Sequence, residues 1–118
     1  AHFVHQSDSG ELAVLGVMFV EGKENPALKP LLAQPLKAGE KAELADKLDI
    51  MPMFPRGQKH YRLNGSLTTP PCSEGVNWIV FKHPVSASKA QLEAMRAMIG
   101  HDNNRPVQPL NARIVVEE

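Results

Sequence analysis

The sequence predicts a mainly β fold (α+β) with a few short helices, and three observations support this prediction. Several apolar runs have the length of strands and are separated by clusters of turn residues. Only one segment, Lys89 to Ile99, has a convincing helical pattern. The longest apolar stretch, Val14 to Val20, is strand-sized and far shorter than the ~18 residues that a membrane span needs. With 118 residues, of which 42% are hydrophobic, the chain has the size of one modest domain or of part of a larger one.

The N-terminal region is predicted to form two strands. Ala1 to Gln6 alternates with a period of two, so His2 and Val4 share one face and His5 lies on the other. A turn cluster then leads into a second strand, Glu11 to Glu21, which completes an antiparallel hairpin. This second strand is apolar on both faces, which favours a central position in a larger sheet. Because the chain starts within a strand, we expect further chain to precede it.

The middle of the chain is predicted to hold only short helical pieces. Asn25 can cap a helix whose apolar face is formed by Leu28, Leu31 and Leu32. The segment Met51 to Gly57 contains two prolines and is predicted to form a turn of 3₁₀ helix.

Three more strands and one helix are predicted for the second half of the chain. The strands are Lys59 to Leu63, Val76 to Lys82 and Arg113 to Val116. The helix Lys89 to Ile99 is expected to begin at a cap formed by Ser86 or Ser88 and to stop at Gly100. Its predicted buried stripe consists of Leu92, Met95, Met98 and Ile99.

The loop Gly65 to Cys72 is the most distinctive stretch of the chain. It holds the adjacent hydroxyl residues Thr68 and Thr69, two consecutive prolines and the only cysteine. A polar loop between two strands can hold a hydroxyl at a reaction centre, although the same residues also serve as ordinary turn formers. By itself, Cys72 is a buried free thiol, a reactive thiol or half of a bridge to another segment.

The composition and motif spacing exclude several functions but do not assemble a metal site. Thirteen basic residues balance thirteen acidic ones, so we expect no nucleic-acid groove and no polybasic membrane patch. His2 and His5 face opposite ways in a strand, and no H-x-H, H-x-x-x-H or C-x-x-C motif is present. Serine-hydrolase motifs are also absent. Taken one by one, the histidines are better interpreted as structural than as ligands.

Four blocks of the sequence nevertheless resemble the α-class carbonic anhydrases, and most of all their bacterial, periplasmic branch. The blocks occur in family order and are Ala1 to His5, Leu12 to Gly16, Tyr61 to Trp78, which contains G-S-L-T-T-P-P-C, and Asn104 to Leu110. The resemblance implies that residues 1–118 are the C-terminal portion of a single α-carbonic anhydrase domain, whose N-terminal portion is absent from this chain. It also implies the C-terminal part of that fold, a large and mostly antiparallel central sheet with peripheral short helices.

The resemblance further implies a zinc enzyme that hydrates carbon dioxide reversibly to bicarbonate and a proton. In that family Zn²⁺ is held by three histidines, of which His2 matches the third. Thr68 matches the threonine that orients the zinc-bound hydroxide and donates a hydrogen bond to a glutamate of the absent portion. Thr69 matches a residue of the same cavity. The apolar wall that receives carbon dioxide is matched by Val4, Val14, Leu67, Val76 and Trp78.

Partners and location are implied in the same way. Cys72 matches a cysteine that pairs with one near the family's N-terminus in extracytoplasmic members, so the expected location is periplasmic or secreted. The expected partners are the N-terminal portion of the same enzyme, carbon dioxide and bicarbonate, and sulfonamide or anion inhibitors. The oligomeric state is left open, with a homodimer as one alternative.

Two other interpretations remain at this stage. The chain could belong to an acatalytic carbonic-anhydrase-like binding domain, because such relatives lack one or more of the zinc histidines. An unrelated β-rich binding module is the third alternative. The residues that precede Ala1 decide between the first two, through the presence or absence of an H-x-H strand.

Overall fold

The computed structural model describes all residues from 1 to 118, and the chain divides into two compact units. The first unit consists of Ala1–Met18, Arg56–Pro84 and Asn104–Glu118, and the second of Phe19–Pro55 and Val85–Asn103. Strands dominate the first unit and short helices are confined to the second. The predicted mainly β fold with few helices is therefore confirmed.

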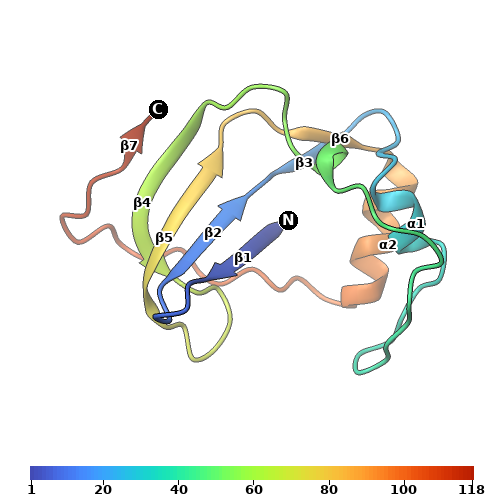
Figure 1. Ribbon diagram of the computed structural model, residues 1–118, viewed down its shortest axis with the longest axis horizontal. Coiled ribbons are helices and arrows are strands. Elements are labelled where there is room, and N and C mark those ends of the chain that lie inside the picture. Colours follow the sequence, from blue (N-terminus) through green and yellow to red (C-terminus); the bar gives the residue numbers. More distant parts are fainter. The chain divides into compact units, whose positions relative to one another are not determined.

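The first unit is built around a mixed five-stranded sheet (Figure 1). In spatial order its strands are β1 (His2–Gln6), β2 (Leu12–Gly16), β5 (Glu74–Phe81), β4 (His60–Ser66) and β7 (Val116–Glu117). All neighbours pair antiparallel except β2 and β5, which run parallel. The sheet is thus mostly antiparallel, as predicted, and the sequence did not indicate its single parallel pair.

Strand β2 is central and strand β1 lies at an edge. β2 pairs on one side with β1 and on the other with β5, and its Val14 is fully buried. Four of the five residues of β1 are exposed. The double-sided apolar pattern of β2 therefore identified the central strand correctly, because such a strand must be covered on both faces.

The predicted strand from Glu11 to Glu21 is wrong as a single strand. It divides into β2 and β3 (Phe19–Glu21), and β3 pairs in parallel with β6 (Val85–Ala87) in the second unit. In the ladder Gly16 faces Val80, whereas Phe19 faces Val85. The segment from Val80 to Val85 is therefore longer than the segment from Gly16 to Phe19, so the two ladders cannot be continuous. Pro84 lies in the longer segment and lacks the N–H that a ladder would require.

The C-terminal strand is also displaced from its predicted position. We predicted Arg113 to Val116, whereas β7 comprises only Val116–Glu117. Asn111 and Ala112 have φ angles of 49° and 64°, in the left-handed region, so the chain turns there before it can enter the sheet.

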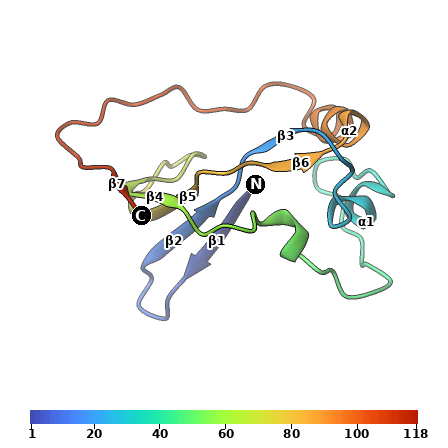
Figure 2. The ribbon, with the colours of Figure 1, turned by 90° about the horizontal axis from the view of Figure 1, so that it is seen from above.

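In the second unit, α1 (Leu28–Leu32) does not begin directly after Asn25, which we predicted as its cap. The side-chain Oδ1 of Asn25 accepts a hydrogen bond from the backbone N–H of Ala27 at 3.0 Å, and its carbonyl accepts one from Leu28. Asn25 therefore caps a turn that precedes the helix. A 3₁₀ helix spans Met51–Met53, as predicted for this region. Figure 2 shows α1 beside α2 (Lys89–Ile99).

Helix α2 has the predicted ends but a different buried face. Ser88 is its N-cap and forms a capping box with Gln91, while Gly100 ends it with a φ of 81°. The predicted stripe is wrong at its C-terminal end, because Met98 and Ile99 are 40% and 46% exposed. Gln91 is the buried residue instead, and its side chain bonds both the N–H and the carbonyl of Asn25. Neither helix combines the length and the apolar character that crossing a membrane would take.

Candidate active site

One face of the five-stranded sheet collects most of the residues that the sequence singled out. Val4, Val14 and Trp78 lie opposite one another on β1, β2 and β5. Side chains paired across a sheet point to the same face, and every second residue of a strand does so too. We call this side of the sheet the reaction face. Its members from the predicted site are His2, Val4, Val14, Val76 and Trp78.

The reaction face is buried at its centre and open at its edge. Val14 and Val76 have no exposed surface, whereas Val4 on the edge strand β1 is 60% exposed. His2 is exposed as well. An apolar surface that runs from a dry centre to an open edge can hold a small nonpolar molecule only when further chain covers that edge.

Trp78 contacts both His2 on the edge strand and the start of the Thr68 loop. Its ring meets the His2 ring edge to face, with centroids 4.9 Å apart and planes at 76°. Its Nε1 donates a 2.9 Å hydrogen bond to the carbonyl of Ser66. The indole lies so close to Gly65 that a Cβ there would stand 2.9 Å from Trp78 Cδ1. Only glycine therefore allows the indole this position.

The loop that carries Thr68 is closed by its own backbone. The N–H of Leu67 donates to the carbonyl of Ser73 at 2.9 Å, and the N–H of Cys72 donates to that of Thr69 at 2.8 Å. The Pro70–Pro71 peptide bond is cis, and Cys72 has a φ of 58°. Thr68 and Thr69 are exposed, and Leu67 is half-buried. Both threonines are therefore exposed on a loop that is closed by backbone hydrogen bonds.

Two arginines from the C-terminal segment bind the end of β4 that leads into the Thr68 loop. Arg105 Nη1 donates to the Ser66 hydroxyl at 2.6 Å and contacts the Leu67 carbonyl at 3.4 Å. Arg113 Nη1 donates to the Asn64 carbonyl at 2.9 Å. Both arginines line a hollow of about 350 Å³. These contacts could not be predicted from the sequence, because no periodicity links residues 38 or more positions apart.

His2 has the chemistry of a metal ligand, although this chain provides no partner ligand for it. Although His2 is exposed as a residue, partial burial of its imidazole lowers the pKa of His2, and the positive charge of the N-terminal amine lowers it further. A lowered pKa favours the neutral imidazole, which is the form that binds a metal. No group of three or more His, Cys, Asp or Glu side chains is placed to hold a metal ion. His2 therefore fits one ligand of a zinc site, which takes three or four ligands.

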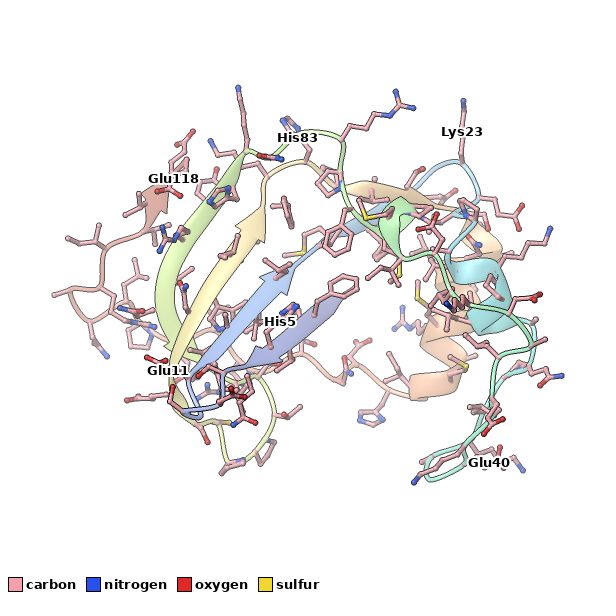
Figure 3. All side chains as sticks on the ribbon, in the orientation of Figure 1. His5, Glu11, Lys23, Glu40, His83 and Glu118 are labelled. Carbon is pink, nitrogen blue, oxygen red and sulfur yellow. The ribbon has the colours of Figure 1, made fainter.

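The remaining histidines do not join His2. His5, labelled in Figure 3, lies on the opposite face of β1, and its Nδ1 is 3.0 Å from the carbonyl of Phe3. His60 lies 2.9 Å from the Glu118 carboxylate at the β4–β7 pair, and its Nδ1 lies 2.6 Å from the carbonyl of Gln58. His83 and His101 are exposed. The interpretation of these four histidines as structural residues stays a prediction.

Comparison with known proteins identifies one family for the whole chain. The family model described as eukaryotic-type carbonic anhydrase matches residues 3–118. A carbonic anhydrase of Klebsiella pneumoniae is 48% identical over 117 residues, which are 98% of this chain and 48% of that protein.

Solved structures give the same result for the fold. The α-carbonic anhydrase of Thermovibrio ammonificans, solved in complex with the inhibitor sulfanilamide, superposes with a TM-score of 0.92 at 54% identity. The match covers 97% of this chain and 51% of that one. A hyperthermostable carbonic anhydrase from a hydrothermal vent chimney gives a TM-score of 0.93 at 50% identity, over 98% of this chain and 52% of that one. The chain therefore spans about half the length of the relatives that it matches.

Proposed function

The chain belongs to the α-type carbonic anhydrase family, and from this premise we propose that it is the C-terminal half of an enzyme that hydrates carbon dioxide. The reaction face carries this proposal, because it joins one metal-binding imidazole to an apolar wall and, through Trp78, to the base of the Thr68 loop. A small nonpolar substrate needs such a dry wall beside the reacting atoms.

His2 is proposed to supply one zinc ligand, and the preceding half of the enzyme the others. In carbonic anhydrases generally, zinc lowers the pKa of a bound water to about 7 and so provides hydroxide at neutral pH. The neutral His2 imidazole is available for ligation, and the Trp78 ring restricts its orientation from the side.

Thr68 is proposed to orient the attacking oxygen. Its hydroxyl can accept one hydrogen bond and donate another, so a threonine held in place selects one direction for the lone pair that attacks carbon. Thr69 and Leu67 would line the same cavity beside it. Val4, Val14 and Val76 would exclude water from the carbon dioxide site.

The proposal extends to inhibitors and to location. The Thermovibrio ammonificans relative was solved with sulfanilamide, and we propose that the completed enzyme binds sulfonamides as well. The proposed location is outside the cytoplasm, in the periplasm or after secretion, where Cys72 could form its bridge.

The deciding experiment compares the isolated chain with a completed enzyme. The completed enzyme is residues 1–118 joined to the portion of the Thermovibrio ammonificans enzyme that the chain does not match. Stopped-flow measurement with a pH indicator should detect carbon dioxide hydration for the completed enzyme loaded with zinc, and none for the 118-residue chain or for the joined portion alone.

Robust hydration by the isolated chain would overturn the proposed division of the site. A completed enzyme that folds and binds zinc but hydrates no carbon dioxide would overturn the catalytic proposal and favour an acatalytic binding domain.

A further inference from the structure

The two residues that precede Thr68 are held from distant parts of the chain. Trp78 Nε1 bonds the Ser66 carbonyl at 2.9 Å, and Arg105 Nη1 bonds the Ser66 hydroxyl at 2.6 Å and approaches the Leu67 carbonyl at 3.4 Å. Thr68 itself is exposed. Its position therefore depends on the backbone that leads into it.

Arg105 is suited to hold that backbone. Its guanidinium is half-buried and belongs to none of the chain's ion pairs, unlike Arg62 and Arg96, which face carboxylates. Its Nη1 donates to two neutral acceptors, the Ser66 hydroxyl and the Leu67 carbonyl. A charged donor makes stronger hydrogen bonds than a neutral one, and the planar guanidinium fixes the angle between its donors.

We propose that Arg105 is a positioning residue that sets the Thr68 hydroxyl by clamping Ser66 and Leu67. This inference rests on the proposed function of Thr68. Without the clamp, the polypeptide on the N-terminal side of Thr68 keeps the Trp78 bond, the Leu67–Ser73 backbone bond and the pairing of Ser66 with Glu74 at the end of β4, but it loses both contacts to the Ser66 hydroxyl and the Leu67 carbonyl. A shift of the reacting group of about 1 Å can cost on the order of 10²-fold in rate.

Arg113 provides a matched control, because it binds the same strand β4 from the C-terminal segment. It is also a half-buried arginine of the C-terminal segment, and it also donates to a backbone carbonyl of β4. However, its acceptor is Asn64, and its other two bonds go to Pro109 and Leu110 in its own loop. Removing Arg113 should therefore affect stability without moving Thr68.

Kinetics of the completed enzyme test the proposal. We expect Arg105→Gln to lower kcat/KM about 10-fold, within the range typical of groups that orient a metal site. Arg105→Lys should recover part of the loss, since it keeps the charge but not the planar donor pair, and Ser66→Ala should give a smaller loss. Arg113→Gln should leave kcat/KM unchanged.

A double-mutant cycle separates positioning from general damage. If Arg105 acts through Thr68, then Arg105→Gln should not lower kcat/KM any further in an enzyme that already carries Thr68→Ala. Arg105→Gln should still lower stability, whether threonine or alanine is present at position 68. The same fold loss with alanine at position 68 would overturn the proposal.

Amide hydrogen exchange gives a readout that does not depend on activity or zinc. In the 118-residue chain and in the completed enzyme, Arg105→Gln should speed exchange across residues 67–73, and Arg113→Gln should not. Unchanged exchange would refute the clamp even in an inactive protein. Faster exchange in a completed enzyme that lacks hydratase activity would support the clamp and contradict the proposed function instead.

Discussion

The rings of His2 and Trp78 meet edge to face with their centroids 4.9 Å apart, although one lies on the edge strand β1 and the other on β5. The register of the strands explains this contact. Trp78 pairs with Val14 and Val14 pairs with Val4, so these side chains share the face that also carries His2. Gly16 pairs with His2 and carries no side chain, and a Cβ there would be in ordinary van der Waals contact with Trp78 Cζ3 at 3.6 Å. The indole therefore packs against Gly16, beside His2.

Trp78 is expected to stabilise the site in two separable ways. In the completed enzyme, Trp78→Phe keeps an aromatic ring beside His2 but loses the bond to the Ser66 carbonyl, which should cost about 1 kcal/mol of unfolding free energy. Trp78→Ala also loses the packing and should cost about 3 kcal/mol or more. Denaturant titration measures both values. Equal losses for the two variants would show that the ring packing contributes nothing.

His2 should determine zinc affinity. Because it is the one ligand that this chain is proposed to supply, His2→Ala in the completed enzyme should weaken zinc binding by about 100-fold or more. His5→Ala is the matched control, because His5 lies on the same strand but on the opposite face. Competition with a chromophoric chelator measures both affinities. Equal zinc affinities for the two variants would remove His2 from the metal site.

The lowered pKa of His2 predicts how stability depends on pH. A histidine with a folded pKa below its unfolded value of about 6.5 binds fewer protons in the folded state, so stability is present above that value and is lost as pH falls through it. The metal-free 118-residue chain should therefore lose stability over the interval that begins as pH falls below about 6.5.

A His2→Gln variant isolates the contribution of His2 to that pH dependence. It should show a shallower loss of stability over the same interval in denaturant titrations, since the group responsible has been removed. NMR titration of the His2 ring should give a midpoint below the usual histidine range. A midpoint above that range would contradict the predicted direction.

Much of the strand structure could be predicted, because alternation and apolar runs report directly on which faces are covered. The positions of β1, β2, β4 and β5 follow from such patterns, and the capping box of α2 follows from local hydrogen-bonding chemistry. What these patterns cannot report is which strand lies beside which. The parallel β2–β5 pair and the break between β2 and β3 depend on register across 64 or more residues.

The same reason explains what was missed at the candidate site. Thr68 and Trp78 stand in a recognisable block of sequence, and the alternation of β1 places His2 and Val4 together. The contact of Arg105 with Ser66 joins residues 39 positions apart through an irregular segment. No local pattern encodes such a contact. The exposed C-terminal end of α2 was mispredicted for a related reason, since periodicity predicts a face but not how far along the helix that face is covered.

Gly65 should be intolerant of even one added methyl group. In Gly65→Ala the new Cβ would stand 2.9 Å from Trp78 Cδ1 and 3.3 Å from Nε1, so the indole must move and its bond to Ser66 is strained. We expect a loss of about 1–3 kcal/mol in the unfolding free energy of the completed enzyme. Gly57→Ala is the control, because its Cβ would meet only His83 Cδ2 at 3.7 Å. Equal losses in the two variants would refute the close packing of Trp78 on β4.

In the proposed full enzyme, Cys72 is expected to form a disulfide with the other half of the molecule. It is half-buried and closes the Thr68 loop through its bond to the Thr69 carbonyl, so a bridge there would restrain both threonines. In the full enzyme, with its own preceding segment and prepared under oxidising conditions, intact mass should be two hydrogens below the reduced value. Cys72→Ser should then lower the unfolding free energy by about 2–5 kcal/mol. The same substitution in the fully reduced enzyme should have little effect, which separates the bridge from simple packing of the thiol. A Cys72 thiol that reacts fully with a thiol reagent in the oxidised, folded enzyme would contradict both the bridge and the oxidising location inferred from it.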